Sequence, residues 1–167
     1  MTLNQARPTI ELWSDGSIQP ANPGPHGGWG AIIVGEEVNE GHRYRAMSGY
    51  YHRATSQRSE AFAVLRSLQA LPTACRVNLV TDSQYVIRCI QNLQRGNMPK
   101  SNTDIWEEMR SMVEKHQLIL DHVYGHTGVD LNEWADKLAY NAAYEMIGRD
   151  EYHDCIPGIR KYIPARS

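Results

Sequence analysis

The spacing of apolar residues along the chain changes at about residue 56. Before that point, residues 9–14, 29–34 and 42–51 alternate or run as short apolar stretches between turn formers, which predicts three strands in an antiparallel meander. After it, residues 57–71 carry apolar side chains at helical spacing, and Pro72 ends the run. The rest of the pattern predicts a strand, two helices, a fifth strand and a last helix, at residues 76–81, 84–94, 103–116, 118–124 and from Asp130 onward.

The predicted elements follow one another in the order βββαβααβα. This order indicates an α/β fold with a mixed five-stranded sheet, three antiparallel strands followed by two parallel ones, flanked by helices. Residues 1–148 fit a single domain, and the polar, proline-containing stretch 149–167 is expected to be a weakly ordered tail. The last helix is expected to bury one stripe of side chains, namely Trp134, Leu138, Ala142 and Met146.

Composition excludes several classes of protein. The 167 residues are 41% hydrophobic and 22% charged, an ordinary globular mixture, so the chain is neither disordered nor fibrous. The longest strongly apolar stretch, at residues 31–34, is far shorter than the roughly 18 residues of a membrane helix. Three widely spaced cysteines and the absence of an export pattern at residues 1–7 argue against a disulfide framework or structural zinc, and favour a reducing, cytoplasmic location.

Charge is segregated along the chain, although the net charge is only −2. Residues 41–59 contain four arginines and no acid, and residues 83–103 contain three basic residues and no acid. Residues 104–154 contain twelve acidic and four basic side chains. Such segregation is typical of a protein with a basic face beside an acidic pocket, and chance clustering on solvated faces is the alternative.

The first and fourth predicted strands each end in an aspartate followed by small polar residues. These are Asp15, before Gly16-Ser17, and Asp82, before Ser83-Gln84. Either aspartate alone is more typical of a turn or a helix cap. At matched ends of neighbouring strands they are more informative, because sites form at the carboxyl ends of strands in open α/β sheets.

Two further acids lie on predicted helices. Glu60 stands in the first turn of the 57–71 helix, where a dipole-favoured glutamate is the simpler interpretation, and Asp136 lies among apolar residues of the last helix and needs a partner. Carboxylates without lysine or arginine among them suit hard divalent cations, above all Mg²⁺, and paired Mg²⁺ ions cleave phosphodiesters. His126 is able to shuttle a proton near neutral pH.

Several motifs, in order from residue 9 to residue 147, resemble type 1 ribonuclease H. They are Asp15-Gly16-Ser17, Asn22-Pro23-Gly24-Pro25, Thr55-Ser56-Gln57-Arg58-Ser59-Glu60, Thr81-Asp82-Ser83-Gln84-Tyr85-Val86, Asn102-Thr103-Asp104-Ile105-Trp106, Gly125-His126-Thr127-Gly128 and Asn132-Glu133-x-Ala135-Asp136. The resemblance implies an RNase H-like fold and Mg²⁺-dependent endonucleolytic cleavage of the RNA strand of RNA–DNA hybrids, by two metal ions, leaving 3′-hydroxyl and 5′-phosphate ends.

The resemblance also implies roles for single residues. Asp15, Glu60, Asp82 and Asp136 would be the catalytic carboxylates and ligands of two Mg²⁺ ions, with Mn²⁺ a possible substitute, and His126 would assist proton transfer or product release. The positions that match the family's substrate contacts comprise the amides Asn22, Gln57, Gln84 and Asn132, the DNA-phosphate residues Arg53 and Thr55, and Gly16, Ser56 and Arg58. A duplex would be recognised through its shape and its 2′-hydroxyls.

Two departures from the family pattern limit this transfer. Ser56 stands where the family usually has asparagine, so one minor-groove contact would be shortened or lost, and the stretch from Asp82 to Asp104 is short for a full basic handle. The alternatives are a pseudoenzyme that only binds hybrids and another nuclease of the same superfold. The chain is expected to act as a monomer on hybrid duplexes, with no membrane and no obligate protein partner.

Overall fold

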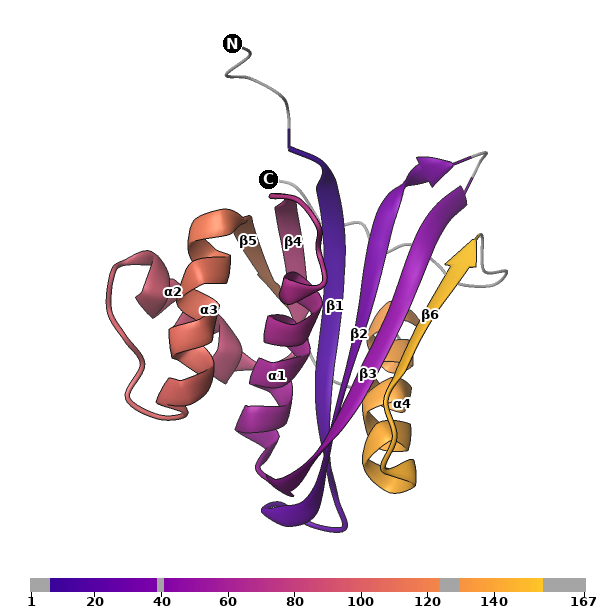
Figure 1. Ribbon diagram of the computed structural model, residues 1–167, viewed down its shortest axis with the longest axis vertical. Helices are drawn as coiled ribbons and strands as arrows, with labels where there is room; N and C mark the ends of the chain where they lie inside the picture. Colours follow the sequence, from indigo (N-terminus) through magenta and orange to yellow (C-terminus); the bar gives the residue numbers. More distant parts are fainter. Residues whose placement is uncertain (1–6, 39–40, 124–129, 155–167) are drawn as a thin grey trace.

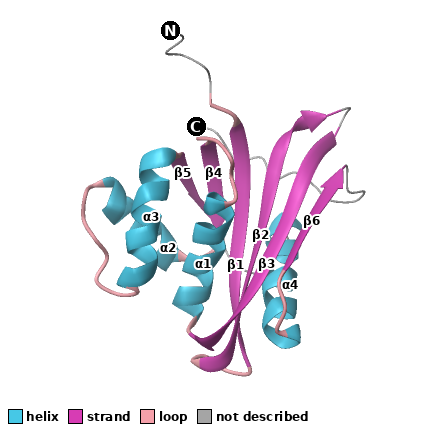
Figure 2. Ribbon diagram, in the orientation of Figure 1, coloured by secondary structure: helices cyan, strands magenta, loops and turns pink. Residues whose placement is uncertain are grey.

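The computed structural model describes residues 7–38, 41–123 and 130–154 (Figures 1 and 2). In these ranges the strands are β1 (Thr9–Gln19), β2 (Gly24–Val38), β3 (Gly41–Ala54), β4 (Arg76–Thr81), β5 (Gln117–His122) and β6 (Arg149–Asp154). The helices are α1 (Ser56–Gln69), α2 (Gln84–Gln94), α3 (Thr103–Lys115) and α4 (Asp130–Glu145). Within the same ranges, no helix is both long and apolar enough to span a bilayer.

The strands form one mixed sheet in the order β5-β4-β1-β2-β3-β6. β1, β2 and β3 pair antiparallel, whereas β1, β4 and β5 run parallel. The mixed α/β sheet flanked by helices is therefore confirmed, but the expected number of five strands is too low. The sixth strand, β6, pairs antiparallel with β3 and consists of residues expected in a loose tail.

Pairing, not hydrophobic alternation, makes β6 a strand. Its residues, Arg-Asp-Glu-Tyr-His-Asp, have no apolar period. The backbone pairs with β3, and Arg45 of β3 holds Asp150 of β6 through two hydrogen bonds, Nε to Oδ1 at 2.9 Å and a terminal guanidinium nitrogen to Oδ2 at 2.8 Å. Residues 155–167, the rest of the expected tail, lie outside the described residues.

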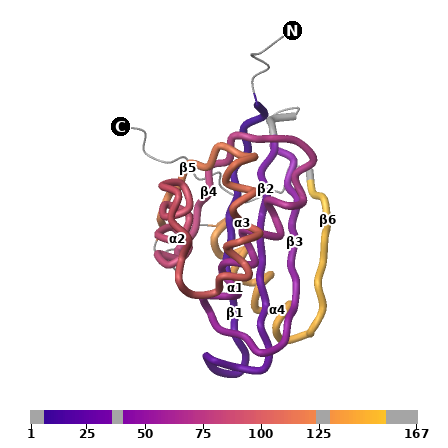
Figure 3. The backbone as a smooth tube through the Cα atoms, turned by 60° about the vertical axis from the view of Figure 1, so that its left-hand side comes forward, coloured from indigo at the N-terminus to yellow at the C-terminus, as the bar shows by residue number. Residues whose placement is uncertain are grey.

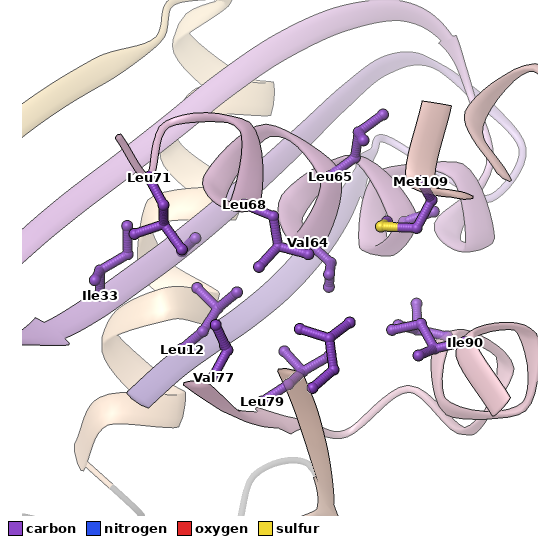
Figure 4. Packing of buried hydrophobic residues seen from close by; sticks show 14 of the residues in the cluster. Leu12, Ile33, Val64, Leu65, Leu68, Leu71, Val77, Leu79, Ile90 and Met109 are labelled. Carbon is purple, nitrogen blue, oxygen red and sulfur yellow. The ribbon is translucent and has the colours of Figure 1, made fainter. Parts of the chain in front are cut away.

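Helices cover both faces of the sheet. α1 lies against one face with α2 and α3 beside it, and α4 lies against the other, as Figures 1 and 3 show. The larger apolar cluster fills the α1 side and includes Leu12, Val64, Leu68, Leu79 and Met109 (Figure 4). A smaller cluster, which includes Trp13, Ile32, Leu131 and Ala135, lies on the α4 side.

α4 packs against β2 almost backbone to backbone. A Cβ atom added to Gly28 would lie 2.1 Å from the Ala139 carbonyl oxygen, and one added to Gly30 would lie 2.4 Å from that of Ala135. The expected stripe on α4 is wrong at Met146, which follows the last helical residue, Glu145, has a φ of 57° and is 54% exposed. The buried residues of α4 are Leu131, Asn132, Ala135, Ala139, Ala142 and Ala143.

Candidate active site

Asp15 and Asp82 meet where the parallel ladder between β1 and β4 ends, although β1 itself continues to Gln19. The ladder between these strands pairs Ser14 with Thr81, so the next residue on each chain is one of the two aspartates. Asp15 is buried and Asp82 is half-buried. The parallel crossover thus places two carboxylates, 67 residues apart in the sequence, side by side.

Glu60 reaches the same point from α1. A Cβ atom on Gly16 would lie 2.7 Å from both the Glu60 backbone nitrogen and the Ser59 Cβ, so a glycine after Asp15 lets α1 lie directly against β1. One carboxylate oxygen from each of Asp15, Glu60 and Asp82 lies within 4.8 Å of the others. We call these three residues the acidic cluster.

Asp136 approaches the acidic cluster from the opposite face of the sheet. It lies in the second turn of α4, half-buried, and its charge acts on Asp15. The close contact of α4 with Gly30 matters here because Gly30 is paired with Asp15 in the β1–β2 ladder. Three of the sequence-predicted carboxylates, from β1, α1 and the end of β4, therefore meet at one point, and the fourth, Asp136 of α4, adjoins Asp15.

Burial and mutual repulsion make the acidic cluster electrostatically unfavourable. Burial, then the charge of Asp82 and that of Asp136, raise the pKa of Asp15 to about 9, against an opposing hydrogen bond from the Gly16 N–H to Oδ1 at 2.8 Å. Burial, followed by repulsion from Asp82, raises the pKa of Glu60 to about 7. A bound divalent cation would relieve this repulsion, and oxygen-only donors are what Mg²⁺ prefers.

Two residues that the sequence analysis did not single out hold the acidic cluster in place. Ser83 caps α2, because its Oγ accepts from the Val86 N–H at 3.1 Å, and its side chain also hydrogen-bonds Glu60. The Tyr51 hydroxyl hydrogen-bonds the Thr55 carbonyl oxygen at 3.1 Å and Ser59 Oγ at 2.8 Å, which ties β3 to the first turns of α1. A serine three residues before the first apolar residue of a helix is a cap signal and would have indicated Ser83.

Most of the predicted substrate amides lie at helix starts beside the acidic cluster. Asn22 and Ser56 bind one another, Nδ2 to Oγ at 3.0 Å and backbone N–H to Oδ1 at 3.2 Å, and Gln57 is exposed next to them. Gln84 is exposed at the first residue of α2. Asn132 differs, since it is only 2% exposed. His126 lies outside the described residues.

Arg53 and Thr55 line a cavity at the end of the sheet. The cavity has a volume of about 430 Å³, and its other lining residues are Pro23, Gly24, Pro25 and Ala54. Arg53 is exposed and has a φ of 55°, and Thr55 caps α1 by accepting from the Arg58 N–H at 3.3 Å. Arg58 itself is bound to both carboxylate oxygens of Asp104, at 3.0 and 2.8 Å, so its guanidinium links α1 to α3.

Comparison with known proteins gives related sequences over most of the chain. The model of the RNase H family matches residues 7–144. A ribonuclease H of Methylococcus capsulatus is 31% identical over 159 residues, which are 89% of this chain and 98% of that protein. One of Pseudomonas fluorescens is 36% identical over 150 residues, covering 84% and 95% of the two chains.

Solved structures with the same fold are also found. The crystal structure titled LC9-RNase H1, a type 1 RNase H with the type 2 active-site motif, has a TM-score of 0.77 at 24% identity and covers 90% of this chain and 79% of that one. RNase H1 of Halobacterium salinarum has a TM-score of 0.61 at 22% identity, covering 82% and 98%. At these identities the structures support the fold alone. The family match, by contrast, extends over the acidic cluster and over Asp136 on the opposite face of the sheet. The resemblance to ribonuclease H is confirmed, and the chain belongs to the RNase H family.

Proposed function

We propose that this enzyme of the RNase H family hydrolyses the RNA strand of RNA–DNA hybrids internally, leaving 3′-hydroxyl and 5′-phosphate ends. The observation that carries the proposal is the acidic cluster, in which oxygens of Asp15, Glu60 and Asp82 lie within 4.8 Å of one another. Its exposed surroundings carry neutral amides in place of a hydrophobic pocket, as suits recognition of a polar duplex by shape and 2′-hydroxyls.

The donor set fits a pair of divalent ions. Asp15, Glu60 and Asp82 supply oxygen ligands only, and the raised pKa values of Asp15 and Glu60 show that their negative charges lack compensation without a cation. We propose that these residues, with Asp136, hold two Mg²⁺ ions, which Mn²⁺ is able to replace. When bound, such ions supply a polarised water for attack on phosphorus and neutralise the charge on the phosphate oxygens.

The chain's own residues would place the duplex over the acidic cluster. Asn22 and Ser56 bind one another at the start of α1, and Gln57 and Gln84 are exposed at the starts of α1 and α2. These amides would hydrogen-bond 2′-hydroxyls and base edges in the minor groove. Arg53, with the Thr55 region of the 430 Å³ cavity, would hold a phosphate of the DNA strand. Contacts from Gly16, Arg58 and Asn132, and proton transfer by His126, remain predictions.

A substrate panel tests the proposal. End-labelled hybrid, single-stranded RNA, double-stranded RNA and duplex DNA are each incubated with the protein and Mg²⁺, and then with excess EDTA. We expect internal cuts in the RNA of the hybrid alone, which EDTA abolishes. Comparable cutting of free RNA would contradict the assigned substrate.

The two alternatives give different results in the same panel. Tight binding of the hybrid with no cleavage in Mg²⁺ or Mn²⁺ would identify a pseudoenzyme. Cleavage of duplex DNA would identify another nuclease of the superfold. Sedimentation of the protein alone and with hybrid tests the further proposal that it acts as a monomer.

A further inference from the structure

Three ring side chains form a hydrogen-bonded cluster on β2 and β3, away from the acidic cluster. The Tyr50 hydroxyl lies 3.0 Å from His26 Nδ1 and 2.9 Å from His52 Nδ1. The ring centroids of the two histidines are 6.5 Å apart, and that of Tyr50 lies 5.0 Å from that of His52. The same oxygen lies 3.5 Å from His52 Nε2, so it is within hydrogen-bonding distance of one nitrogen of His26 and of both nitrogens of His52. We call these three residues the His–Tyr–His cluster.

The pairing of the strands fixes this arrangement. His26 and His52 are direct partners in the antiparallel β2–β3 ladder, and Tyr50 is partner to Gly28, two residues along the same face. Direct partners have Cβ atoms about 4.5–5.5 Å apart, which brings two imidazoles within reach of one ion. The sheet backbone therefore already holds the three side chains together, so ordering them costs little on binding.

The distances within the cluster match those between ligands of a single metal ion. Ligands about 2.0–2.1 Å from one ion, at tetrahedral or square-planar angles, lie about 2.8–3.4 Å from one another. The two observed separations, 3.0 and 2.9 Å, fall within this range. Imidazole nitrogens favour Zn²⁺, Cu²⁺ and Ni²⁺, whereas Mg²⁺ favours oxygen ligands, so the chemistry of this cluster differs from that of the acidic cluster.

We propose that His26, Tyr50 and His52 form a binding site for a divalent transition-metal ion, with Zn²⁺ or Cu²⁺ bound by the two Nδ1 atoms and the tyrosine oxygen. On binding, the Tyr50 hydroxyl gives up its proton to solvent, and an imidazole that carries its proton on Nδ1 shifts that proton to Nε2, which frees both Nδ1 lone pairs and the phenolate oxygen for the ion. Water completes the coordination.

The proposed site is accessible and separate from the acidic cluster. His52 is exposed and the other two residues are half-buried, so an ion has a path of entry. In the β1–β2 ladder Asp15 is paired with Gly30 and Gln19 with His26, so the two sites are four residues apart along the strands, about 13 Å. Their occupancies are therefore measurable independently.

Calorimetric titration with Zn²⁺ tests the site. The whole protein is titrated above neutral pH with Mg²⁺ in excess, so that the acidic cluster is already supplied with its preferred ion. We expect His26→Ala and His52→Ala each to bind one Zn²⁺ fewer than the parent, and Tyr50→Phe to bind the same number at least about tenfold more weakly. His42→Ala is the matched control, because His42 is also on β3 but hydrogen-bonds the Gly35 carbonyl oxygen at 3.1 Å.

Cu²⁺ gives a second readout that a merely structural cluster would not produce. Coordination by Tyr50 is expected to give a tyrosinate-to-copper charge-transfer band, present in the parent and His42→Ala and absent in Tyr50→Phe. Melting curves of the metal-free variants establish that each is folded. The proposal is overturned if folded His26→Ala and His52→Ala bind as many Zn²⁺ ions as the parent, or if Cu²⁺ gives no such band in the parent.

Discussion

The two faces of the sheet are packed in different ways. On the α1 side, branched side chains from the sheet and from α1, α2 and α3 interdigitate in the larger apolar cluster, where residues such as Leu68 and Leu79 are fully buried. On the α4 side, the helix backbone lies directly on Gly28 and Gly30, and alanines fill most of the contact. On the α1 side the helices therefore pack through large side chains, whereas on the α4 side the helix backbone itself lies against the sheet.

This difference separates stability from the geometry of the site. Burial of large apolar side chains supplies most of the folding free energy, so the α1 side, which holds the larger apolar cluster, contributes the larger share of the stability. The close approach on the α4 side brings Asp136 near Asp15, at a cost that the other face offsets, since like charges gather there. Substitutions on the α1 side should therefore change mainly the free energy of unfolding. Substitutions on the α4 side should change mainly kcat.

The largest effect is expected for Asp15→Asn on kcat. Loss of the most central ligand should lower kcat for a labelled hybrid in Mg²⁺ by at least about a thousandfold, because the transition-state charge would lose its main support. The same change should raise the melting temperature of the metal-free protein, since a neutral amide removes the cost of burying this carboxyl beside Asp82 and Asp136, the cost that raises its pKa. Steady-state rates and melting curves in EDTA measure the two quantities.

The control for this prediction is Glu107→Gln, which neutralises an exposed carboxylate on α3. It should leave both the rate and the melting temperature close to those of the parent. If metal-free Asp15→Asn is instead less stable than the parent and keeps the parent's full stabilisation by Mg²⁺, then Asp15 is a structural turn residue and the assigned site is wrong.

The next largest effect is expected for Leu68→Ala on stability. Leu68 has no exposed surface in the larger cluster, and its truncation should lower the free energy of unfolding by about 2–5 kcal/mol. kcat per folded molecule should stay that of the parent. Urea denaturation measures the first quantity. Ile119→Ala, at a side chain that is 46% exposed, should change stability by no more than about 0.5 kcal/mol.

The sequence predicted most accurately the helices and strands whose ends are marked by capping or turn residues. Residues 76–81 and 84–94 have the same bounds in the structure as in the prediction, because Ser83 caps α2. β6 was missed because its six polar residues become a strand only through pairing with β3. β1 extends to Gln19, past the turn expected at Asp15-Gly16-Ser17, because its backbone continues to pair with β2.

In the candidate site, too, the features with a local sequence signal were predicted, and those that depend on tertiary packing were not. The sequence predicted from matched strand ends that Asp15 and Asp82 meet. They do meet, but only Asp82 follows the end of its strand, and the shared position is the end of the parallel β1–β4 ladder. The burial of Asn132 and the engagement of Arg58 with Asp104 depend on how α4 and α3 pack, which no local pattern encodes. The close contact of α4 at Gly28 and Gly30 was also unpredicted, because a glycine in a strand does not reveal which backbone will lie against it.

A moderate effect on both the free energy of unfolding and kcat is expected for Gly30→Ala. The added methyl group would meet the backbone of α4, so the helix must shift, which should cost about 1–3 kcal/mol of stability. Because α4 carries Asp136, kcat should fall as well, by about tenfold. In Gly35→Ala, on the same strand, the nearest atom would be the Arg43 carbonyl oxygen at 3.4 Å, an ordinary contact. Equal behaviour of the two variants would show that close approach at Gly30 is not required.

The smallest effects are expected in the pH dependence of metal-free stability, where two regions should act with opposite sign. The folded-state pKa of Asp15, about 9, and that of Glu60, about 7, lie above their ordinary values. Their contribution to stability is therefore fully present in acid and is lost as the pH rises through these values. His116, buried on the α1 side, has its pKa lowered by burial and by the charge of Lys115, so its contribution is present above about pH 6.5 and is lost as the pH falls.

Urea midpoints measured in EDTA over a pH series separate the two contributions. Each proton involved changes the free energy of unfolding by at most about 1.4 kcal/mol per pH unit. Asp15→Asn should remove a decline in stability that runs from the ordinary carboxyl value of about pH 4 up to about pH 9. His116→Asn, which keeps an acceptor for the Cys75 N–H that His116 Nδ1 binds at 3.0 Å, should flatten the profile below pH 6.5 alone. If the parent and both variants gave parallel profiles, neither burial of His116 nor burial and repulsion at Asp15 would set the pH dependence, and the electrostatic contrast between His116 and the acidic cluster would fail.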